Sequence, residues 1–267
     1  MDNRRIAIFD SGLGGLTVAK YLVEKMPNEK IIYFGDTART PYGSKDVETI
    51  RKFTIQICDF LVANDIKMLV IACNTISATC KDILKERYPD LPIIDVISPM
   101  AERVANDFAD DSIGVIATKV TVGSGAYEKQ INDLSPDTKV NSMACPLFVP
   151  MIEEGVRDNK ILNPTIKFYL DNFLWDNKVD SLILGCTHYP IIESNIRQLY
   201  PSLKVLNPSK ETVKKIRSYL EEHDMKAARP PYENMYFASD MSDSFINMIE
   251  NIDPSSRARF KKFSGTV

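Results

Sequence analysis

Long apolar runs, closely spaced cysteine pairs and low-complexity stretches are all absent from this sequence. No segment approaches the roughly 18 consecutive apolar residues of a membrane span, and the first apolar run, which ends at Asp10, is too short for a secretion signal. We therefore expect a cytoplasmic protein with no membrane contact. The five cysteines form no Cys-x-x-Cys pair, so we expect free thiols and no disulfide framework.

An excess of one charge sign is also absent, and histidine is scarce, with two residues in the chain. The 33 Lys and Arg against 36 Asp and Glu give a formal net charge of −3, which does not indicate a nucleic-acid partner. A hydrophobic content of 44% and a charged content of 26% are ordinary for a globular protein. At 267 residues the chain accommodates one large domain or two small ones.

Short apolar runs alternate with amphipathic helical stretches along the whole chain. The predicted strands are 5–10, 30–35, 68–72, 92–96, 113–116, 138–143, 181–185, 204–206 and 234–238, and the clearest helices are 13–26, 47–62 and 165–175. This rhythm predicts parallel sheets with helices on both faces. Three helix starts are predicted where a capping residue precedes a proline, at Ser98-Pro99, Asn163-Pro164 and Asn207-Pro208.

The two halves of the sequence are alike. An apolar strand opens each half, within 6–12 and 113–118, and a cysteine motif follows later in each. We predict an α/β protein with two similar parallel-sheet αβα domains, related by a pseudo-two-fold duplication; the alternative is that the same strand–helix pattern arose in each half independently. Residues 1–97 and 207–267 would form the first domain, because the last strand needs a sheet to join, and residues 98–206 the second.

The two cysteine motifs are near-copies of each other. Residues 69–75 read LVIACNT and residues 182–188 read LILGCTH, so each has an apolar run, a small residue, a cysteine and then polar groups. A thiol at the carboxyl end of a buried strand lies where open α/β sheets bind ligands. Cys73 and Cys186 would therefore face one ligand from opposite sides. Such a pair suits inversion of a stereocentre, because one thiolate removes a proton and the other thiol delivers one to the opposite face.

Each motif also has a purely structural interpretation. Asn74 or Thr75 would cap the following helix and Cys73 would fill space, as we expect for Cys58, Cys80 and Cys145. In the functional interpretation, the nearby helix amino terminus lowers the thiol pKa and favours the thiolate.

The second motif adds an imidazole, because His188 follows Cys186 closely. The duplicated setting makes a functional role the better interpretation of this histidine. Together with Cys73 these residues could supply three metal ligands, but no zinc spacing accompanies them. We therefore expect no metal at this site.

Three glycines follow the first predicted strand. Gly12, Gly14 and Gly15 permit close backbone approach to a ligand and expose a helix amino terminus. The same pattern opens a dinucleotide-binding fold, but Thr17 stands at the third glycine position and the charge of Asp10 would oppose a pyrophosphate. A small anionic or zwitterionic ligand fits better; the alternative is that the glycines serve the turn alone.

Five separated motifs together resemble the glutamate racemases of the aspartate/glutamate racemase family. They are, in order, FDSGLGG at 9–15, YFGDTARTPYG at 33–43, ACNT at 72–75, CPLFVPMIEEG at 145–155 and LGCTHYP at 184–190. The resemblance implies a cofactor-independent enzyme that interconverts L- and D-glutamate and supplies the D-isomer for peptidoglycan. It also implies two α/β domains with the active site in the cleft between them, and family members commonly pair as homodimers.

The resemblance further implies a role for each site residue. Cys73, assisted by Asp10, would exchange a proton with D-glutamate; Cys186, assisted by His188, would do so with L-glutamate, and Glu153 would orient His188. Burying two carboxylates without many arginines requires dense hydrogen bonding. The implied substrate-binding residues are Asp10, Ser11, Pro41, Tyr42, Gly43, Asn74, Thr75, Thr118, Thr121, Thr187 and His188.

Two stretches depart from the family pattern: Ser98-Pro99-Met100 stands where Glu-Pro-Gly is expected, and Ala117-Thr118 where Gly-Thr is expected. Two other functions stay open at this point. One is a racemase for aspartate or another amino acid, because glutamate differs from aspartate by one methylene. The other is a non-catalytic binding protein that kept the fold.

Overall fold

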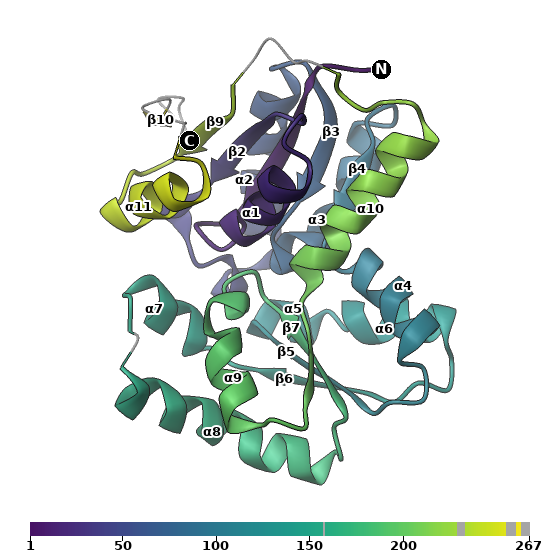
Figure 1. Cartoon of the computed structure of the whole chain (residues 1–267), viewed down its shortest axis with the longest axis vertical. Helices are drawn as coiled ribbons and strands as arrows, with labels where there is room; N and C mark the ends of the chain where they lie inside the picture. Colours follow the sequence, from purple (N-terminus) through teal and green to yellow (C-terminus); the bar gives the residue numbers. More distant parts are fainter. Residues whose placement is uncertain (157, 229–232, 255–259, 263–267) are drawn as a thin grey trace.

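The computed structural model of this chain contains two parallel β-sheets, and helices cover both faces of each sheet (Figure 1). The structure describes residues 1–156, 158–228 and 233–254, and the backbone of 260–262. The sheets lie one above the other along the long axis of the molecule. The predicted fold class, α/β with two parallel-sheet domains, is confirmed.

The first sheet has six strands in the order β10-β9-β2-β1-β3-β4. Alternate residues of the central strand pack on opposite faces, with Ile6 and Ile8 in one apolar cluster and Ala7 and Phe9 in the other. This alternation explains why the strand is apolar throughout: both faces of a parallel sheet are buried. The strands are β1 (Arg5–Asp10), β2 (Ile31–Gly35), β3 (Ile66–Ile71), β4 (Ile93–Asp95), β9 (Met235–Ala238) and β10 (Phe260–Lys262).

In the described part of the chain, helices cover both faces of this sheet. The helices α1 (Leu16–Lys25), α10 (Pro208–Glu222) and α11 (Asp243–Ile252) pack on the face of Ile6 and Ile8. The opposite face is covered by α2 (Val47–Val62) and α3 (Asn74–Arg87), whose cluster includes the buried Cys58 and Cys80. These two cysteines pack as small apolar side chains, as predicted.

The second sheet has four strands in the order β6-β5-β7-β8. Its strands are β5 (Ile113–Ala117), β6 (Val140–Ala144), β7 (Ser181–Gly185) and β8 (Lys204–Leu206). One face carries α4 (Ser98–Asp107) and α6 (Ala126–Leu134), and the other carries α7 (Phe148–Glu153), α8 (Asn159–Asp176) and α9 (Glu193–Leu199). The short α5 (Lys119–Gly123) follows β5, and 3-10 turns occupy Thr37–Arg39 (η1), Tyr42–Ser44 (η2) and Tyr189–Ile192 (η3).

The two sheets repeat one topology. The order β2-β1-β3-β4 in the first sheet corresponds to β6-β5-β7-β8 in the second. Cys73 follows β3 and Cys186 follows β7, so the two thiols stand after equivalent strands. This equivalence is what the predicted duplication requires.

The chain passes between the sheets twice. Strands β1–β4, β9 and β10 belong to the first sheet, and β5–β8 to the second. The exact boundaries, with residues 1–97 and 207–267 in one domain and 98–206 in the other, stay a prediction.

Most predicted elements lie where the sequence places them, but one helix start and one capping residue were wrong. Helix α4 begins at Ser98 with Pro99 in its first turn, as predicted, but the Ser98 side chain does not cap it. Asp95, not Ser98, caps α4, because the Asp95 carboxylate accepts from the backbone N–H groups of Ile97 and Ser98 at 2.8 and 2.9 Å. Helix α8 begins at Asn159, capped by Asp158, and contains Pro164 within it. The third start is confirmed: the Asn207 side chain accepts from the Ser209 N–H at 3.0 Å.

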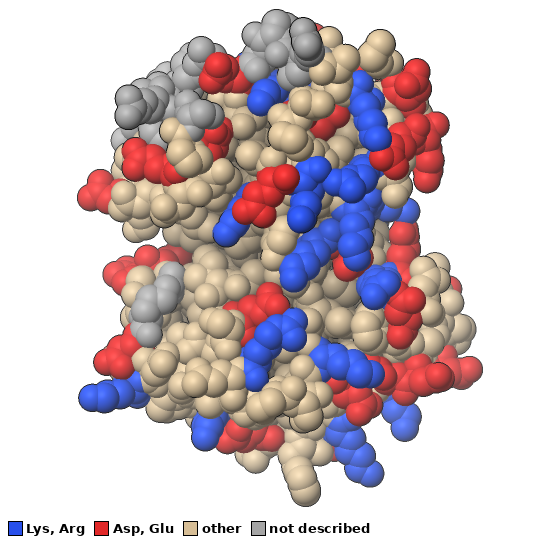
Figure 2. Space-filling view, viewed as in Figure 1, with Lys and Arg blue, Asp and Glu red and all other residues tan. Residues whose placement is uncertain are grey.

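The surface carries a local concentration of positive charge that the net charge conceals. Figure 2 shows Lys and Arg side chains gathered over α1 and α10, where Lys25, Lys210, Lys214 and Arg217 line a groove beside Tyr21. Among the described residues, no helix is both long enough and apolar enough to cross a membrane.

Candidate active site

The carboxyl ends of the two sheets meet, and polar side chains bond across the junction. From the first sheet, the Asp10 carboxylate at the end of β1 accepts from the Thr187 hydroxyl at 3.2 Å. Farther along, the Tyr127 hydroxyl of α6 donates to Asn74 Oδ1 of α3 at 2.7 Å. Parallel α/β sheets bind ligands at this edge, so the candidate site lies between the two sheets.

Cys73 lies in an extended conformation between β3 and α3, at the N-cap position of the helix. Its side chain is buried, and the sulfur is 3.4 Å from the Ser11 hydroxyl. Burial, and then the charge of Asp10, raise the pKa of Cys73 to about 12, against the opposing effect of the Ser11 hydrogen bond. Without a ligand, Cys73 is therefore a protonated thiol at neutral pH.

Asp10 is fully buried and held by two donors. Its carboxylate accepts from the Gly12 backbone N–H at 2.9 Å and from Thr187. It acts on Cys73 through its charge, which disfavours the thiolate.

Cys186 lies in a chain of three groups. Its sulfur is 3.7 Å from His188 Nδ1, and His188 Nε2 is 3.0 Å from Glu153 Oε1 of α7. Burial lowers the pKa of His188, but the contacts with Cys186 and Glu153 together outweigh burial and raise it to about 10. An imidazolium therefore stands beside Cys186 at neutral pH and attracts negative charge on the sulfur.

Three threonine hydroxyls form a cluster across the junction. Thr75 of α3 is 3.0 Å from Thr118 and 3.4 Å from Thr121, and the latter two are 3.0 Å apart. Thr118 caps α5 by accepting from the Thr121 N–H. Each hydroxyl can rotate to donate to an anion, so the cluster is suited to a carboxylate.

Asn74 supplies the sharpest indication of a ligand. Its side chain is buried, and its Oδ1 is occupied by Tyr127. Among the described residues, its Nδ2 has no hydrogen-bond partner. A buried amide donor without a partner is costly unless a ligand or water accepts from it.

The loop after β2 closes one side of the site. The Thr40-Pro41 peptide bond is cis, and the buried Tyr42 side chain donates to Asp36 within its own domain. A Cβ on Gly43 would lie 2.4 Å from Cβ of Thr118, so only glycine allows this close approach to the second domain. Pro41, Gly43 and Thr118 line a cavity of about 100 Å³ that reaches Cys145.

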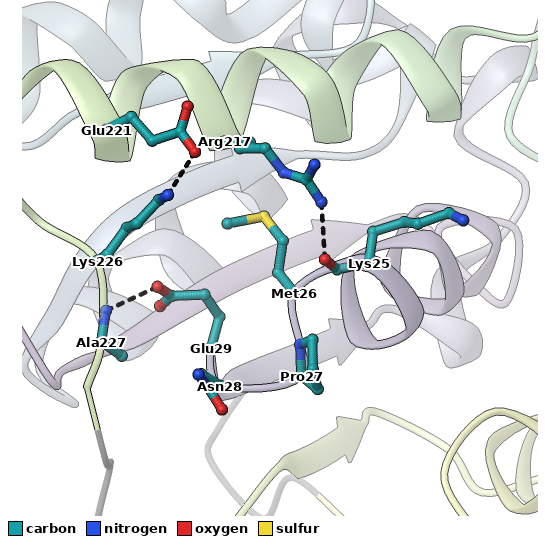
Figure 3. A pocket seen from close by; sticks show the side chains of 9 residues that line it. All are labelled: Lys25, Met26, Pro27, Asn28, Glu29, Arg217, Glu221, Lys226 and Ala227. Carbon is teal, nitrogen blue, oxygen red and sulfur yellow. Dashed lines mark hydrogen bonds and ion pairs between the residues drawn. The ribbon is translucent and has the colours of Figure 1, made fainter.

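A second pocket differs from the candidate site in its position and in how its charged groups are bonded. It lies at the amino-terminal edge of the first sheet, between the end of α1 and α10 (Figure 3). Several of its charged groups are engaged with each other or with the backbone: Lys226 pairs with Glu221, and Arg217 donates to the Lys25 carbonyl at 2.8 Å. This edge is opposite to the one where α/β sheets bind ligands.

Direct contacts link several of the site residues that the sequence singles out, and the structure adds others. Tyr127 fixes Asn74, and the Thr40 hydroxyl donates to Glu153 at 3.4 Å. Tyr127 lies in an ordinary amphipathic helix, which gives no signal of a site. Thr40 could have been predicted as a site residue from the sequence, because it directly precedes Pro41 in the loop motif, where the neighbouring residues were predicted to contact the ligand.

Comparisons with known proteins agree with this geometry. The profile of the family described as Asp/Glu/Hydantoin racemase matches residues 17–216. A glutamate racemase of Geobacter metallireducens is 41% identical over 249 residues, which cover 92% of this chain and 91% of the relative.

Solved structures are similar over nearly the whole chain. Glutamate racemase from Francisella tularensis, in complex with D-glutamate, has a TM-score of 0.90 at 41% identity and covers 99% of this chain and 98% of that one. A glutamate racemase isoform from Bacillus anthracis has a TM-score of 0.91 at 32% identity, with coverage of 99% and 98%.

Proposed function

The chain belongs to the Asp/Glu/hydantoin racemase family, and we propose that it interconverts L- and D-glutamate by proton transfer through Cys73 and Cys186. The observation that carries the proposal is the pair of buried thiols after equivalent strands of two sheets. D-glutamate is a component of peptidoglycan, so the reaction supplies cell-wall synthesis. A soluble substrate of this size needs no membrane surface, and we place the enzyme in the cytoplasm.

The first step removes the α-proton of L-glutamate. The Cys186 thiolate takes the proton to form an S–H bond, and the electron pair of the broken Cα–H bond moves into the α-carboxylate. The imidazolium of His188, 3.7 Å from the sulfur, stabilises the thiolate before this step. Glu153 holds the imidazole ring in place from its other nitrogen.

The second step reprotonates the planar carbon from the opposite face. The Cys73 thiol, whose pKa is raised to about 12, is present as the acid and donates its proton to Cα to give D-glutamate. Cys73 is left as a thiolate. In the reverse direction that thiolate is the base, and Ser11, 3.4 Å from its sulfur, donates to it.

The substrate carboxylates are held by neutral donors. The Asn74 amide, the three-threonine cluster and the backbone of the loop at Tyr42 and Gly43 surround the junction of the two sheets. Thr187 and Asp10 lie near the thiols, where Asp10 is suited to accept from the substrate ammonium. Many hydrogen bonds from uncharged groups can stabilise the negative charge that develops on the α-carboxylate, so this step needs no cofactor.

The proposal is tested by replacing each thiol. Cys73→Ala and Cys186→Ala should each lower racemisation of L- and D-glutamate by about 10²- to 10⁴-fold, the usual contribution of a general acid or base. Circular dichroism of the substrate follows the reaction. Cys80→Ala, which removes a buried thiol outside the site, is the matched control.

The same assay separates the alternatives. Near-normal racemisation by either site variant overturns the two-thiol mechanism. Turnover of aspartate but not of glutamate by the unaltered protein keeps the mechanism and changes the substrate. Tight glutamate binding without turnover supports a binding protein instead.

A further inference from the structure

A groove between helices α1 and α10 concentrates positive charge at the surface (Figure 2). It has a volume of about 770 Å³ and is lined by seven residues, none of which is acidic. Four of the seven are cationic: Lys25, Lys210, Lys214 and Arg217. Because the whole chain has a formal net charge of −3, this local excess does not follow from the overall composition.

The cations come from two helices and converge on one space. On α10, residues 210, 214 and 217 follow the i, i+4, i+7 spacing of a single helix face. From α1, Lys25 reaches the groove in the last turn of the helix. Like charges gathered in one concave surface raise the positive potential there and attract an anion.

Most of the lining charge lacks a carboxylate partner. Among the described residues, only one of the four cations forms an ion pair, which joins Lys214 to Glu211 at 2.9 Å. The lysines that flank the groove without lining it are both paired: Lys20 lies 3.9 Å from Glu24, and Lys215 lies 2.8 Å from Glu102. Charge is therefore left available inside the groove and is neutralised around it.

The stability of α10 does not account for these positions. Lys210 lies in the first turn of the helix, where the positive end of the macrodipole disfavours a cation. Lys210 and Lys214 also form a like-charged i, i+4 pair, which destabilises a helix. A bound anion relieves both unfavourable effects.

Contacts between the helices hold two of the cationic groups in place. Arg217 Nη2 donates to the Lys25 carbonyl at 2.8 Å, at the end of α1 (Figure 3). Lys210 Nζ lies 5.7 Å from the centroid of the Tyr21 ring. Groups that are already positioned lose less conformational entropy when a ligand binds.

We propose that the groove between α1 and α10 is a binding site for an oligophosphate anion, a linear chain of three or more phosphoryl groups. Residues 210–217 span about 10 Å along α10 at 1.5 Å per residue, so a matching ligand carries several negative charges over a short length. The Arg217 guanidinium presents parallel N–H donors that fit phosphate oxygens, and the lysines act as point charges. The proposal does not rest on the racemase reaction, because its test measures binding.

The lining favours this ligand class over an acidic peptide or a nucleic-acid base. Val213 is 4% exposed, and Tyr21 packs against the apolar cluster of the first sheet, so neither forms an open apolar subsite for a peptide side chain. Lys210 already lies over the Tyr21 ring, where a base would otherwise stack. Charge is therefore the main means of recognition in this groove.

Calorimetric titration of the full chain with sodium tripolyphosphate, in metal-free buffer, tests the proposal. At about 25 mM salt we expect a Kd on the order of 10 µM, weakened about tenfold or more at about 300 mM salt, because ions screen exposed charges. Orthophosphate should bind at least about tenfold more weakly, because a single phosphoryl group reaches fewer of the cations.

Charge-removing variants locate the site. Lys210→Gln combined with Arg217→Gln should weaken tripolyphosphate binding about 10²-fold, because two charge-assisted contacts are lost. Arg217→Lys keeps the charge but removes the fork of donors, and should weaken binding about three- to tenfold. The matched control, Lys85→Gln combined with Lys167→Gln, removes the same charge from exposed positions on α3 and α8 and should bind like the unaltered protein. Urea unfolding checks that every variant is folded.

Three results overturn the proposal. The first is the absence of binding at about 1 mM tripolyphosphate in low salt. The second is an equal loss of affinity in the groove variant and in the matched control, which would mean that only net charge matters. The third is binding of citrate, a tricarboxylate, as tightly as tripolyphosphate.

Adenosine triphosphate distinguishes two sources of the same phosphate chain. Tighter binding than tripolyphosphate, lost in the groove variant, supports the proposal with a nucleoside triphosphate as the ligand. Equal or weaker binding supports it with an inorganic chain.

Discussion

At the scale of residues, the two thiols have different surroundings although their strands are equivalent. Cys73 is next to a hydroxyl and within the field of a carboxylate, whereas Cys186 is next to an imidazolium. The first environment raises the pKa of the Cys73 thiol, and in the second the pKa of His188 is raised. Under the proposed mechanism, this difference assigns deprotonation of L-glutamate to Cys186 and reprotonation to Cys73.

The pKa of His188 tests this difference between the surroundings of Cys73 and Cys186. Its pKa is raised from 6.5 to about 10, so the folded protein favours the protonated ring. The associated stability is fully present below the unfolded pKa of 6.5 and is lost as pH rises through about 10. NMR should show one histidine, His188, that titrates near pH 10.

Glu153→Gln should lower the pKa of His188 by about 1 unit or more, because it removes a negative charge 3.0 Å from Nε2. The L-to-D rate should then decline at lower pH than in the unaltered protein. An unchanged His188 titration in this variant would contradict the role given to Glu153.

The Asn74 side chain, whose Nδ2 has no hydrogen-bond partner among the described residues, leads to a further prediction. Tyr127→Phe removes the 2.7 Å hydrogen bond that fixes Asn74, and the amide gains rotational freedom. A hydrogen bond of about 1 kcal/mol corresponds to a roughly fivefold rise in KM for glutamate. The value of kcat should change less, because neither thiol is touched. An effect on kcat alone would argue against Asn74 as a substrate donor.

At the scale of elements, the turn between β1 and α1 connects the two domains sterically. A Cβ on Gly14 would lie 2.5 Å from His188 Nδ1 and 2.6 Å from the Thr187 hydroxyl. Gly14→Ala should therefore displace the histidine and lower activity strongly, with a loss of about 1–3 kcal/mol of stability from overpacking.

Gly123→Ala is the control, because a Cβ there meets no atom within 4 Å. Activity and urea unfolding are compared for both variants. Equal activity of the two would mean that the turn does not hold His188 in place.

The elements show how far local sequence reasoning extends. β1 and β7 have the predicted bounds, because buried parallel strands are continuous apolar runs with clear ends. The start of α8 was wrong because Asn163 is used elsewhere: its Oδ1 accepts from Asn195 at 3.0 Å. Asp158 caps the helix instead. Local pattern alone cannot say which of two capping residues is engaged by a tertiary contact.

Local sequence pattern also fails to predict the tertiary contacts of the candidate site. Cys73, Cys186 and His188 follow strand ends, where the sequence carries a strong pattern. Tyr127 reaches Asn74 from the other domain, and such a contact depends on how the two sheets are placed. The local concentration of positive charge on α1 and α10 was equally hidden, since the net charge is −3.

At the scale of the whole molecule, a buried ion pair connects distant parts of the first domain. Lys67 of β3 and Glu29 are 2.6 Å apart, with side chains 0% and 3% exposed. Lys67 also donates to the carbonyls of Asp2 and Met225, each at 2.8 Å. The pair thereby holds the amino terminus and the segment after α10 against the sheet.

Lys67→Met should lower the free energy of unfolding by about 3–5 kcal/mol, because it leaves the Glu29 carboxylate buried without its cation. Urea denaturation measures the loss, and the exposed Lys85→Met is the control. The substitution lies far from both thiols, so kcat at low temperature should be retained. A loss below 1 kcal/mol would show that Glu29 finds another partner or becomes protonated.

The two-thiol account is tested most directly by racemisation of pure L-glutamate in D2O, with the unaltered protein and no added cofactor. Circular dichroism follows the loss of optical activity, and NMR follows α-deuterium. The account predicts D-glutamate that carries deuterium at Cα from its first appearance, while the remaining L-glutamate stays largely protiated, because each thiol serves one face. D-glutamate formed with retention of the α-proton, or rapid deuterium exchange into L-glutamate without inversion, would contradict it.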